Sequence, residues 1–165
     1  MIVAIKAVVT DFGGVLVRTE DPRGRQKWEE ILGLRPGDLA HEVFESGAAV
    51  RATTGEVPES AVWQSVGSAY KLDESQLRQL QVDFWSGDQL DSLLVDFLHS
   101  LRPRYKTAIL SNAWSGARRA FTQSYHLDEA VDQIIISAEE KLAKPDQRFY
   151  QLAADRLGVT FKLRL

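Results

Sequence analysis

Short apolar runs and stretches with helical spacing alternate along this chain. The run Ala7-Val8-Val9-Thr10 ends at Asp11 with Gly13-Gly14 behind it, a pattern typical of a buried strand that stops at a tight turn. Residues 105–110 and 133–136 form two more apolar runs of strand length. Because helical patterns separate these strands, the sequence predicts an α/β fold with a parallel sheet.

A long helical stretch lies between the first and second predicted strands. From Pro22 to Leu101 apolar residues recur at helical spacing, and we identify no strand among them. We therefore expect residues 19–101 to form a helical insert and a connecting helix, and residues 1–18 and 102–165 to form an α/β core. The helix signals in the insert are Asp38 before Leu39 and Val43, Pro58 before Ala61, Asp73 with Gln76 as a capping box, and the run Leu90 to Leu101 before Pro103.

The C-terminal part of the chain continues the α/β pattern. Residues 117–125 predict a helix, and a final helix begins near Asp146, which is expected to cap it, and ends at Gly158. Residues 159–165 alternate between apolar and polar, which predicts a strand with one solvated face. We interpret Glu139-Glu140-Lys141 as a solvated loop.

Composition and charge exclude several classes of protein. The 165 residues are 44% hydrophobic and 26% charged, which is enough apolar material for the core of one globular domain. The formal net charge is −3 and no basic block is present, so we expect no nucleic acid partner. Cysteine is absent, which excludes disulfides, thiolate metal sites and cysteine nucleophiles in this sequence.

The same reasoning bears on location. No apolar run approaches the roughly 20 residues that cross a bilayer. The apolar N-terminus runs into Asp11 rather than into a small-residue cleavage site. We expect a soluble, cytoplasmic protein without a membrane partner.

Polar side chains follow the predicted strands at the edge where parallel sheets bind ligands. Asp11 follows the first strand, Ser111 and Asn112 follow the second, and Lys144 lies in the loop after the third. A carboxylate, a hydroxyl with an amide, and an ammonium together suit a phosphoryl group, which needs a nucleophile, hydrogen-bond donors and a countercharge. Taken singly, Asp11 could form a turn, Asn112 could cap a helix and Lys144 could be a solvated loop charge.

Three motifs in this order resemble those of the haloacid dehalogenase-like hydrolases. The resemblance covers about residues 3 to 159. The motifs are Val9–Leu16, Ile109–Asn112, and Lys144–Asp146 with Phe149 and Leu157–Val159. The resemblance implies a Rossmann-like parallel sheet core with a small α-helical cap inserted after strand one.

The resemblance also implies a mechanism, the hydrolysis of a small phosphate ester through an aspartyl-phosphate intermediate. Asp11 would be the nucleophile, and Ser111 and Lys144 would orient and neutralise the transferred group. Asn112 and Gly14 would contact the substrate. Trp114 follows Asn112 closely enough to touch substrate as well, although packing under the cap is an equally good interpretation.

A magnesium ion is the cofactor that the resemblance implies. It would sit beside Asp11, and the backbone carbonyl of Gly13 could face it. Most family phosphatases carry an aspartate at the position of Gly13, and this acid–base group contributes a factor of about 10² to 10⁴ in rate. Some branches of the family carry glycine there.

The fourth motif of the family, a strand that ends in acidic magnesium ligands, should follow Val159. Residues 161–165 contain no carboxylate, so weak metal affinity is expected. In the family this strand lies beside the first, and without it the run Ala7-Val8-Val9 would be an exposed apolar edge. We expect either that the alternating tail covers this edge or that the chain forms a homodimer.

Two other functions remain open from the sequence. A metal-independent 2-haloacid dehalogenase is compatible with Gly13, because a halide leaves without protonation. A non-catalytic or remnant protein that retains the fold is the alternative from another class. The sequence does not identify the substrate, because in this family the cap sets specificity.

Overall fold

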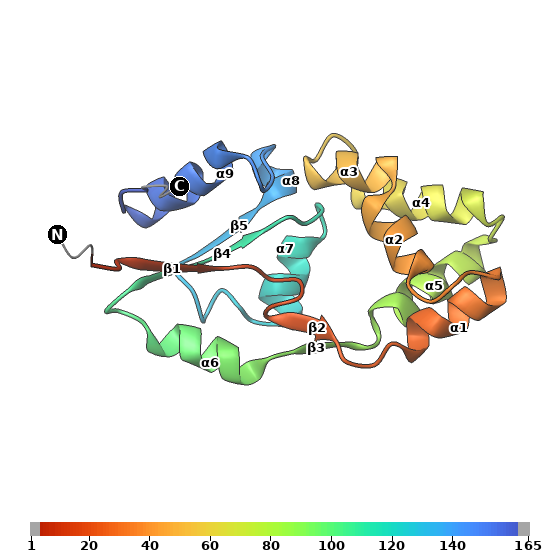
Figure 1. Cartoon of the computed structure of the whole chain (residues 1–165), viewed down its shortest axis with the longest axis horizontal. Coiled ribbons are helices and arrows are strands. Elements are labelled where there is room, and N and C mark those ends of the chain that lie inside the picture. The colour runs from red at the N-terminus through yellow and green to blue at the C-terminus, as the bar shows by residue number, and fades with distance from the viewer. Residues whose placement is uncertain (1–3, 162–165) are drawn as a thin grey trace.

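The core of the protein is a three-stranded parallel sheet (Figure 1). A computed structural model describes residues 4–161. The strands are β1 (Ala7–Thr10), β4 (Lys106–Ser111) and β5 (Gln133–Ile136), in the order β1-β4-β5. Val9 lies opposite Ala108, and Ile109 lies opposite Ile134, so the strands share one direction. The predicted α/β fold with a parallel sheet is confirmed.

Helices cover both faces of this sheet, because successive residues of a buried parallel strand point to opposite faces. Leu110 and Ile135 pack against Phe149 on one face, and Ile109 packs with Leu98 and other residues on the other. Figure 1 shows α9 on one side of the sheet and α6 on the other. The helices of the core are α6 (Ser92–Ser100), α7 (Ala117–Arg119) continued by the π-helical turn η1 (Ala120–Ser124), α8 (Ser137–Glu140) and α9 (Gln147–Leu157).

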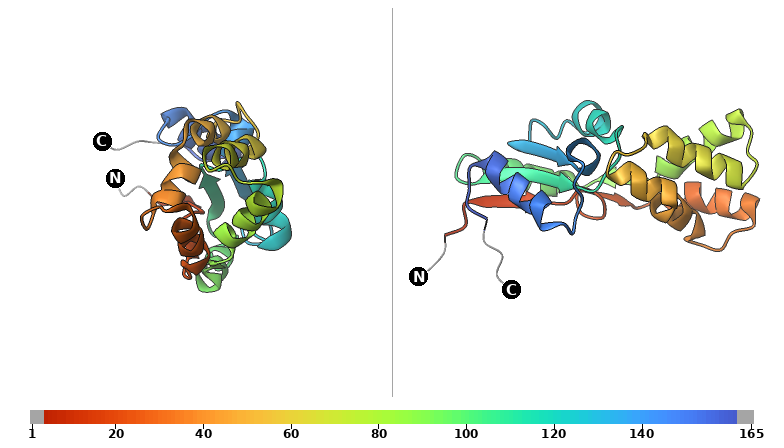
Figure 2. Two further views of the ribbon diagram at one scale, coloured as in Figure 1. Left: turned by 90° about the vertical axis from the view of Figure 1, so that its right-hand side faces the viewer. Right: turned by 90° about the horizontal axis from the view of Figure 1, so that it is seen from above.

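Five further helices form a separate layer, here called the cap, at one end of the long axis of the molecule (Figure 2). Their buried residues form an apolar cluster of their own that includes Leu39, Val43, Val62, Leu80 and Phe84. The helices are α1 (Arg23–Leu32), α2 (Asp38–Glu45), α3 (Gly47–Thr53), α4 (Glu59–Ala69) and α5 (Glu74–Trp85).

Two short antiparallel strands join the cap to the core, and one of them corrects the sequence analysis. β2 (Val17–Thr19) pairs with β3 (Asp88–Leu90), although no strand was expected between residues 22 and 101. β3 has three residues, of which two are polar, so it shows no alternation that a strand pattern could reveal. Its pairing partner, β2, is distant in sequence. Across the two strands, the Thr19 hydroxyl donates a hydrogen bond to Asp88 Oδ1 at 2.6 Å.

Capping interactions explain where several helices begin and end. The predicted capping box is confirmed, since Gln76 N donates to Asp73 Oδ1 and Asp73 N donates to Gln76 Oε1. Asp146 caps α9 by accepting from Arg148 N at 2.9 Å, and Gly158 ends that helix at φ +68°. The prediction that Asp38 caps α2 was wrong, because Asp38 is the first residue of this helix and Gly37 is its N-cap.

The strand that the alternation predicts for residues 159–165 is absent from its described part. Residues 159–161 form no strand, and the Phe161 ring stacks on Tyr150 at 6.2 Å between centroids. Residues 162–165 lie outside the described part of the chain. Within residues 4–161, β1 pairs with β4 alone, so the expectation that the tail or a second copy covers β1 stays a prediction. No helix in this part of the protein is long and apolar enough to cross a membrane.

Candidate active site

Two of the predicted site residues meet in an ion pair at the carboxyl edge of the sheet. Lys144 Nζ lies 2.6 Å from Asp11 Oδ2. Asp11 directly follows β1, and Lys144 lies in the loop between α8 and α9, beyond the end of β5. The Asp11 side chain is 41% exposed and that of Lys144 is 20% exposed. The pair therefore stands where a small molecule can reach it.

A tight turn anchored in the core fixes the Asp11 carboxylate. Asp11 Oδ1 accepts a hydrogen bond from Phe12 N at 2.8 Å. The Phe12 carbonyl in turn accepts from Leu16 N and Val17 N, which closes the turn. The Phe12 ring packs on Phe121, with centroids 4.0 Å apart. A carboxylate has about four acceptor positions, so it keeps acceptor capacity beyond these two contacts.

Asn112 holds the backbone of Lys144 through two reciprocal hydrogen bonds. Lys144 N donates to Asn112 Oδ1 at 2.8 Å, and Asn112 Nδ2 donates to Lys144 O at 2.9 Å. The sequence analysis assigned Asn112 to substrate contact. The structure shows that its amide group supports the loop that carries Lys144, a role that no local sequence spacing reveals.

Two serines at the ends of β4 and β5 differ in their surroundings. Ser111 is buried, and its hydroxyl makes no hydrogen bond to another residue of the described chain. Ser137, which the sequence analysis gave no role, accepts from Ala113 N at 3.0 Å and donates to Ala113 O at 3.2 Å. Ser137 thereby joins the loop after β4 to the start of α8, and the contact of Ser111 with substrate stays a prediction.

The two glycines of the turn after Asp11 have different constraints. Gly14 adopts φ +74° and its N–H donates to Val17 O at 2.9 Å, so this N–H is already used within the turn. Gly13 is exposed, and a Cβ built on it would meet no atom within 4 Å. Open space therefore lies beside the residue two positions after Asp11.

Trp114 lies at the boundary between the core and the cap. Its side chain is 8% exposed and belongs to the apolar cluster of the cap helices. Its ring centroid lies 5.9 Å from that of Phe44 and 6.5 Å from that of Trp63. The structure places Trp114 in packing between core and cap, and its contact with substrate stays a prediction.

The donors near Asp11 do not make a complete magnesium site. Magnesium requires near-octahedral oxygen coordination. Within residues 4–161, no three His, Asp or Glu side chains are placed to hold a metal ion together. The Asp11 carboxylate and the Gly13 carbonyl are the two donors that the sequence analysis assigned, and Asp11 is already paired with Lys144. These residues alone do not fit the ion.

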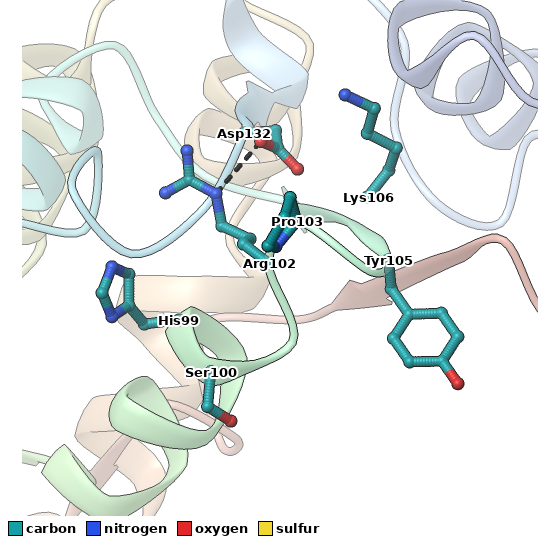
Figure 3. Close-up of a pocket in the computed structure, with 7 residues that line it drawn as sticks. All are labelled: His99, Ser100, Arg102, Pro103, Tyr105, Lys106 and Asp132. Atoms are coloured by element: carbon teal, nitrogen blue, oxygen red, sulfur yellow. Dashed lines mark hydrogen bonds and ion pairs between the residues drawn. The ribbon is translucent and has the colours of Figure 1, made fainter.

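A hollow of about 440 Å³ lies at the N-terminal end of β4, at the opposite edge of the sheet from Asp11. Figure 3 draws seven residues that line it. Lys106, the first residue of β4, contributes to its lining, together with Arg102, Asp132 and neighbouring residues. Arg102 Nε donates to Asp132 Oδ1 at 3.1 Å, so the charge of this guanidinium is compensated. Neither Asp11 nor Lys144 lines the hollow, so the hollow is separate from the Asp11 site.

The fold and the Asp11–Lys144 pair define an α/β protein with a helical cap beside a charged site at the carboxyl ends of its strands. The family model for haloacid dehalogenase-like hydrolases matches residues 5–163. The chain belongs to this family, as the three sequence motifs predicted.

Two curated relatives share part of the sequence. (S)-2-haloacid dehalogenase 1 of Pseudomonas sp. (strain CBS-3) is 47% identical over 55 residues, which are 33% of this chain and 24% of that protein. (S)-2-haloacid dehalogenase 4A of Burkholderia cepacia is 42% identical over 55 residues, again 33% of this chain and 24% of the relative. The matched segment thus spans about a quarter of the length of these relatives.

Solved structures with the same fold include different kinds of family member. A HAD family enzyme of Bacteroides thetaiotaomicron, in complex with magnesium and inorganic phosphate, has a TM-score of 0.74 at 18% identity, covering 94% of this chain and 80% of that chain. The L-2-haloacid dehalogenase of Xanthobacter autotrophicus, with chloropropionic acid covalently bound, has a TM-score of 0.63 at 24% identity. The match covers 95% of this chain and 66% of that chain. At these identities the likeness shows the fold.

Proposed function

We propose that the protein hydrolyses a small phosphate ester by covalent catalysis, with Asp11 as the nucleophile. The observation that carries this proposal is the 2.6 Å pair of Lys144 Nζ and Asp11 Oδ2 at the carboxyl edge of the sheet. A carboxylate beside an ammonium suits an electrophile that carries negative charge. Inorganic phosphate in the related Bacteroides crystal is consistent with this substrate class.

The chemistry divides into two displacements. In the first, an Asp11 carboxylate oxygen attacks phosphorus, the bond from phosphorus to the ester oxygen breaks, and the alcohol leaves as an alkoxide or phenolate that takes a proton from water. In the second, water attacks phosphorus, the bond from Asp11 to phosphorus breaks, and phosphate is released. Lys144 would compensate the charge on the equatorial oxygens, and Ser111 would donate a hydrogen bond to one of them.

Magnesium accompanies the related Bacteroides enzyme in its crystals. The described residues of this chain supply too few oxygen ligands to hold the ion by themselves. The proposal therefore assigns charge compensation to Lys144.

A second candidate is hydrolysis of a 2-haloacid, which the exposed Gly13 and the names of the two curated relatives favour. Asp11 would attack C2 of the acid, the bond from carbon to halogen would break, and halide would leave with the electron pair. Water would then attack the carbonyl carbon of the Asp11 ester, releasing a 2-hydroxy acid and a proton. A halide leaves without protonation, so the absence of an acid at Gly13 carries no penalty.

One experiment separates these functions. The purified protein is assayed with an aryl phosphate for phosphate release and with 2-chloropropionate for chloride release, each with magnesium and with a chelator. Asp11→Asn is the test variant, and Asp155→Asn, an exposed aspartate on α9, is the control. Phosphate release that only Asp11→Asn abolishes supports the first function, and chloride release with this dependence supports the second. A folded protein with neither activity overturns both and indicates a non-catalytic member of the family.

A further inference from the structure

Lys141 connects the core to the cap. The residue directly follows α8, and its Nζ donates to the backbone carbonyl of Gly55, in the loop between α3 and α4, at 2.6 Å. Residues 139–141 were expected to form a solvated loop; Glu139 and Lys141 are exposed, but Glu139 and Glu140 belong to α8 rather than to a loop. Arg118 pairs with Glu139 at 2.6 Å, and Arg156 pairs with Glu140 at 2.7 Å. Every residue of this segment thus has a specific partner.

The backbone conformation of Lys141 is unusual for a lysine just after a helix. Lys141 adopts φ +58°, in the left-handed region that is unfavourable for any residue with a Cβ. Glycine enters this region freely and is the usual residue just after a helix. The hydrogen bond of the Lys141 ammonium to the cap is an additional contact, since Lys71 has a similar φ of +53° without one.

The cap and the core lie very close where Lys141 reaches across. A Cβ built on Gly55 would lie 2.2 Å from the carbonyl oxygen of Ala138 in α8, closer than atoms can approach. Only a residue without a side chain fits there. A second contact lies nearby, where Glu59 N donates to Ser115 Oγ at 3.3 Å. The Lys141 hydrogen bond is therefore part of a close contact between the two layers.

The same short loop carries Lys144. Leu142, the residue after Lys141, packs against the core cluster that contains Phe149. Asn112 holds the backbone of Lys144 at the other end of the loop. The segment from Lys141 to Lys144 is thus attached to the cap at one end and to the end of β4 at the other.

We propose that Lys141 is a positioning residue, which orients Lys144 toward Asp11 when the cap rests on the core. The inference rests on the proposed covalent role of Asp11. It adds that the placement of the Lys144 ammonium depends on the cap, through one hydrogen bond to the carbonyl of Gly55. Lys141 touches neither the substrate nor the reacting atoms.

The test compares Lys141 with a lysine in the same backbone conformation. Lys71, at φ +53° between α4 and α5, has a side chain that makes no hydrogen bond or ion pair to any described residue. Lys141→Met is expected to lower kcat/KM about three- to tenfold, mainly through kcat, as loss of one charge-assisted hydrogen bond allows. Lys71→Met should leave kcat/KM unchanged, and Lys141→Arg should restore most of the loss.

A measurement without turnover accompanies the kinetics. Hydrogen exchange of residues 141–148, which includes the Lys144 amide bonded to Asn112, is expected to be faster in Lys141→Met than in Lys71→Met or the unmodified protein. Equal exchange and equal kcat/KM in the two methionine variants would overturn the proposal. If the unmodified protein turns over neither substrate, the proposed function fails, whereas the exchange comparison still decides whether Lys141 restrains this loop.

Discussion

Lys144 Nζ and Asp11 Oδ2 lie 2.6 Å apart, although the two residues come from opposite ends of the chain. The parallel sheet makes this meeting possible, because the segments that follow β1 and β5 leave the sheet at the same edge. An ammonium in this place holds the carboxylate in one orientation and can also share its charge with an anionic substrate. In the proposed mechanism, the pair would combine a nucleophile, Asp11, with charge compensation by Lys144.

Removal of the Lys144 charge is the first prediction. Lys144→Met should lower kcat/KM about 10²- to 10³-fold, because a preorganised charge at the reacting group is lost. The measurement is steady-state hydrolysis of whichever substrate the protein turns over. Lys106→Met, at the opposite edge of the sheet, is the control and should retain full activity. Full activity in Lys144→Met would contradict any role of the Lys144 ammonium in the reaction, whether on the substrate or on Asp11.

The second prediction concerns Asn112, whose amide makes both hydrogen bonds to the backbone of Lys144. Asn112→Ala should lower the free energy of unfolding by about 1–2 kcal/mol, because two backbone groups lose their partner. It should also lower kcat, because Lys144 is then less well held. Urea unfolding and steady-state kinetics measure the two effects.

A comparison with Asn112→Asp refines this test. The aspartate can still accept from Lys144 N, but its second oxygen faces the Lys144 carbonyl without a proton between them. Loss of activity in both variants supports a positioning role for the amide. Retained activity in Asn112→Ala would mean that Lys144 does not need the two hydrogen bonds from Asn112.

Much of the site follows from the sequence for a physical reason. Each β-branched run is interrupted by a polar residue where it leaves the sheet, and parallel strands bring these ends to one edge. The meeting of Asp11 and Lys144 was therefore predictable, as was the parallel sheet itself. The capping box at Asp73 was predictable because capping depends on residues three positions apart.

The contacts between distant loops could not be predicted. Nothing in local spacing indicates that Asn112 will bind the backbone of Lys144, or that Lys141 will reach Gly55. β3 was missed for a related reason. Its three residues are too few to show the alternation of apolar and polar residues typical of a strand, and its pairing depends on β2. Tertiary geometry creates these relationships, and a single sequence contains no signal for them.

A third prediction concerns how the stability of the cap depends on pH. Asp83 on α5 is 17% exposed and accepts from Lys27 Nζ, Trp28 Nε1 and Gln79 Nε2, each at 2.8 Å. The hydrogen bond from the Lys27 ammonium, with those from Trp28 and Gln79, holds the pKa of Asp83 below its ordinary value of 3.8, against the opposing effect of burial. A lowered pKa means that the ionised carboxylate stabilises the fold above pH 3.8 and that this contribution is lost as pH falls through the lowered pKa.

Asp83→Asn should therefore melt at a lower temperature than the unmodified protein at pH 7. The difference should shrink as the pH falls below 3.8. Tryptophan fluorescence reports the transition, because Trp28 is buried in the cap and bonded to Asp83. Asp96→Asn, an exposed residue on α6, serves as the matched control. A constant difference in melting temperature from pH 7 to strong acid would contradict the assignment to ionised Asp83.

The close approach of cap and core gives a fourth prediction. Gly55 and Gly33 adopt similar left-handed conformations, at φ +64° and +68°, but a Cβ on Gly33 meets nothing within 4 Å. Gly33→Ala should cost about 1–2 kcal/mol for the backbone conformation alone. Gly55→Ala should cost about 1–3 kcal/mol more, because its methyl group would collide with the Ala138 carbonyl. Urea unfolding measures both, and equal costs would show that the two layers do not press together at this point.

The last prediction uses the open space at Gly13 to choose between the two proposed substrates. Gly13 is exposed, and a Cβ built there meets no atom within 4 Å outside its chain neighbours, so Gly13→Asp should fold. In a phosphatase the new carboxylic acid would stand two residues after Asp11 and protonate the departing oxygen. Hydrolysis of alkyl phosphates, whose alkoxides leave poorly, should then rise by about 10²-fold. Aryl phosphates should gain little, because phenolates leave without help.

Gly13→Asn is the control, since the asparagine side chain has the same shape as aspartate but no acidic proton to transfer. The informative quantity is the ratio of alkyl to aryl phosphate turnover, which is independent of how much of each preparation is active. A ratio that rises in Gly13→Asp and not in Gly13→Asn places the leaving group beside residue 13. In a dehalogenase the leaving halide needs no proton, so the same substitution should leave chloride release unchanged or slower. An unchanged ratio together with chloride release would therefore favour the 2-haloacid as substrate.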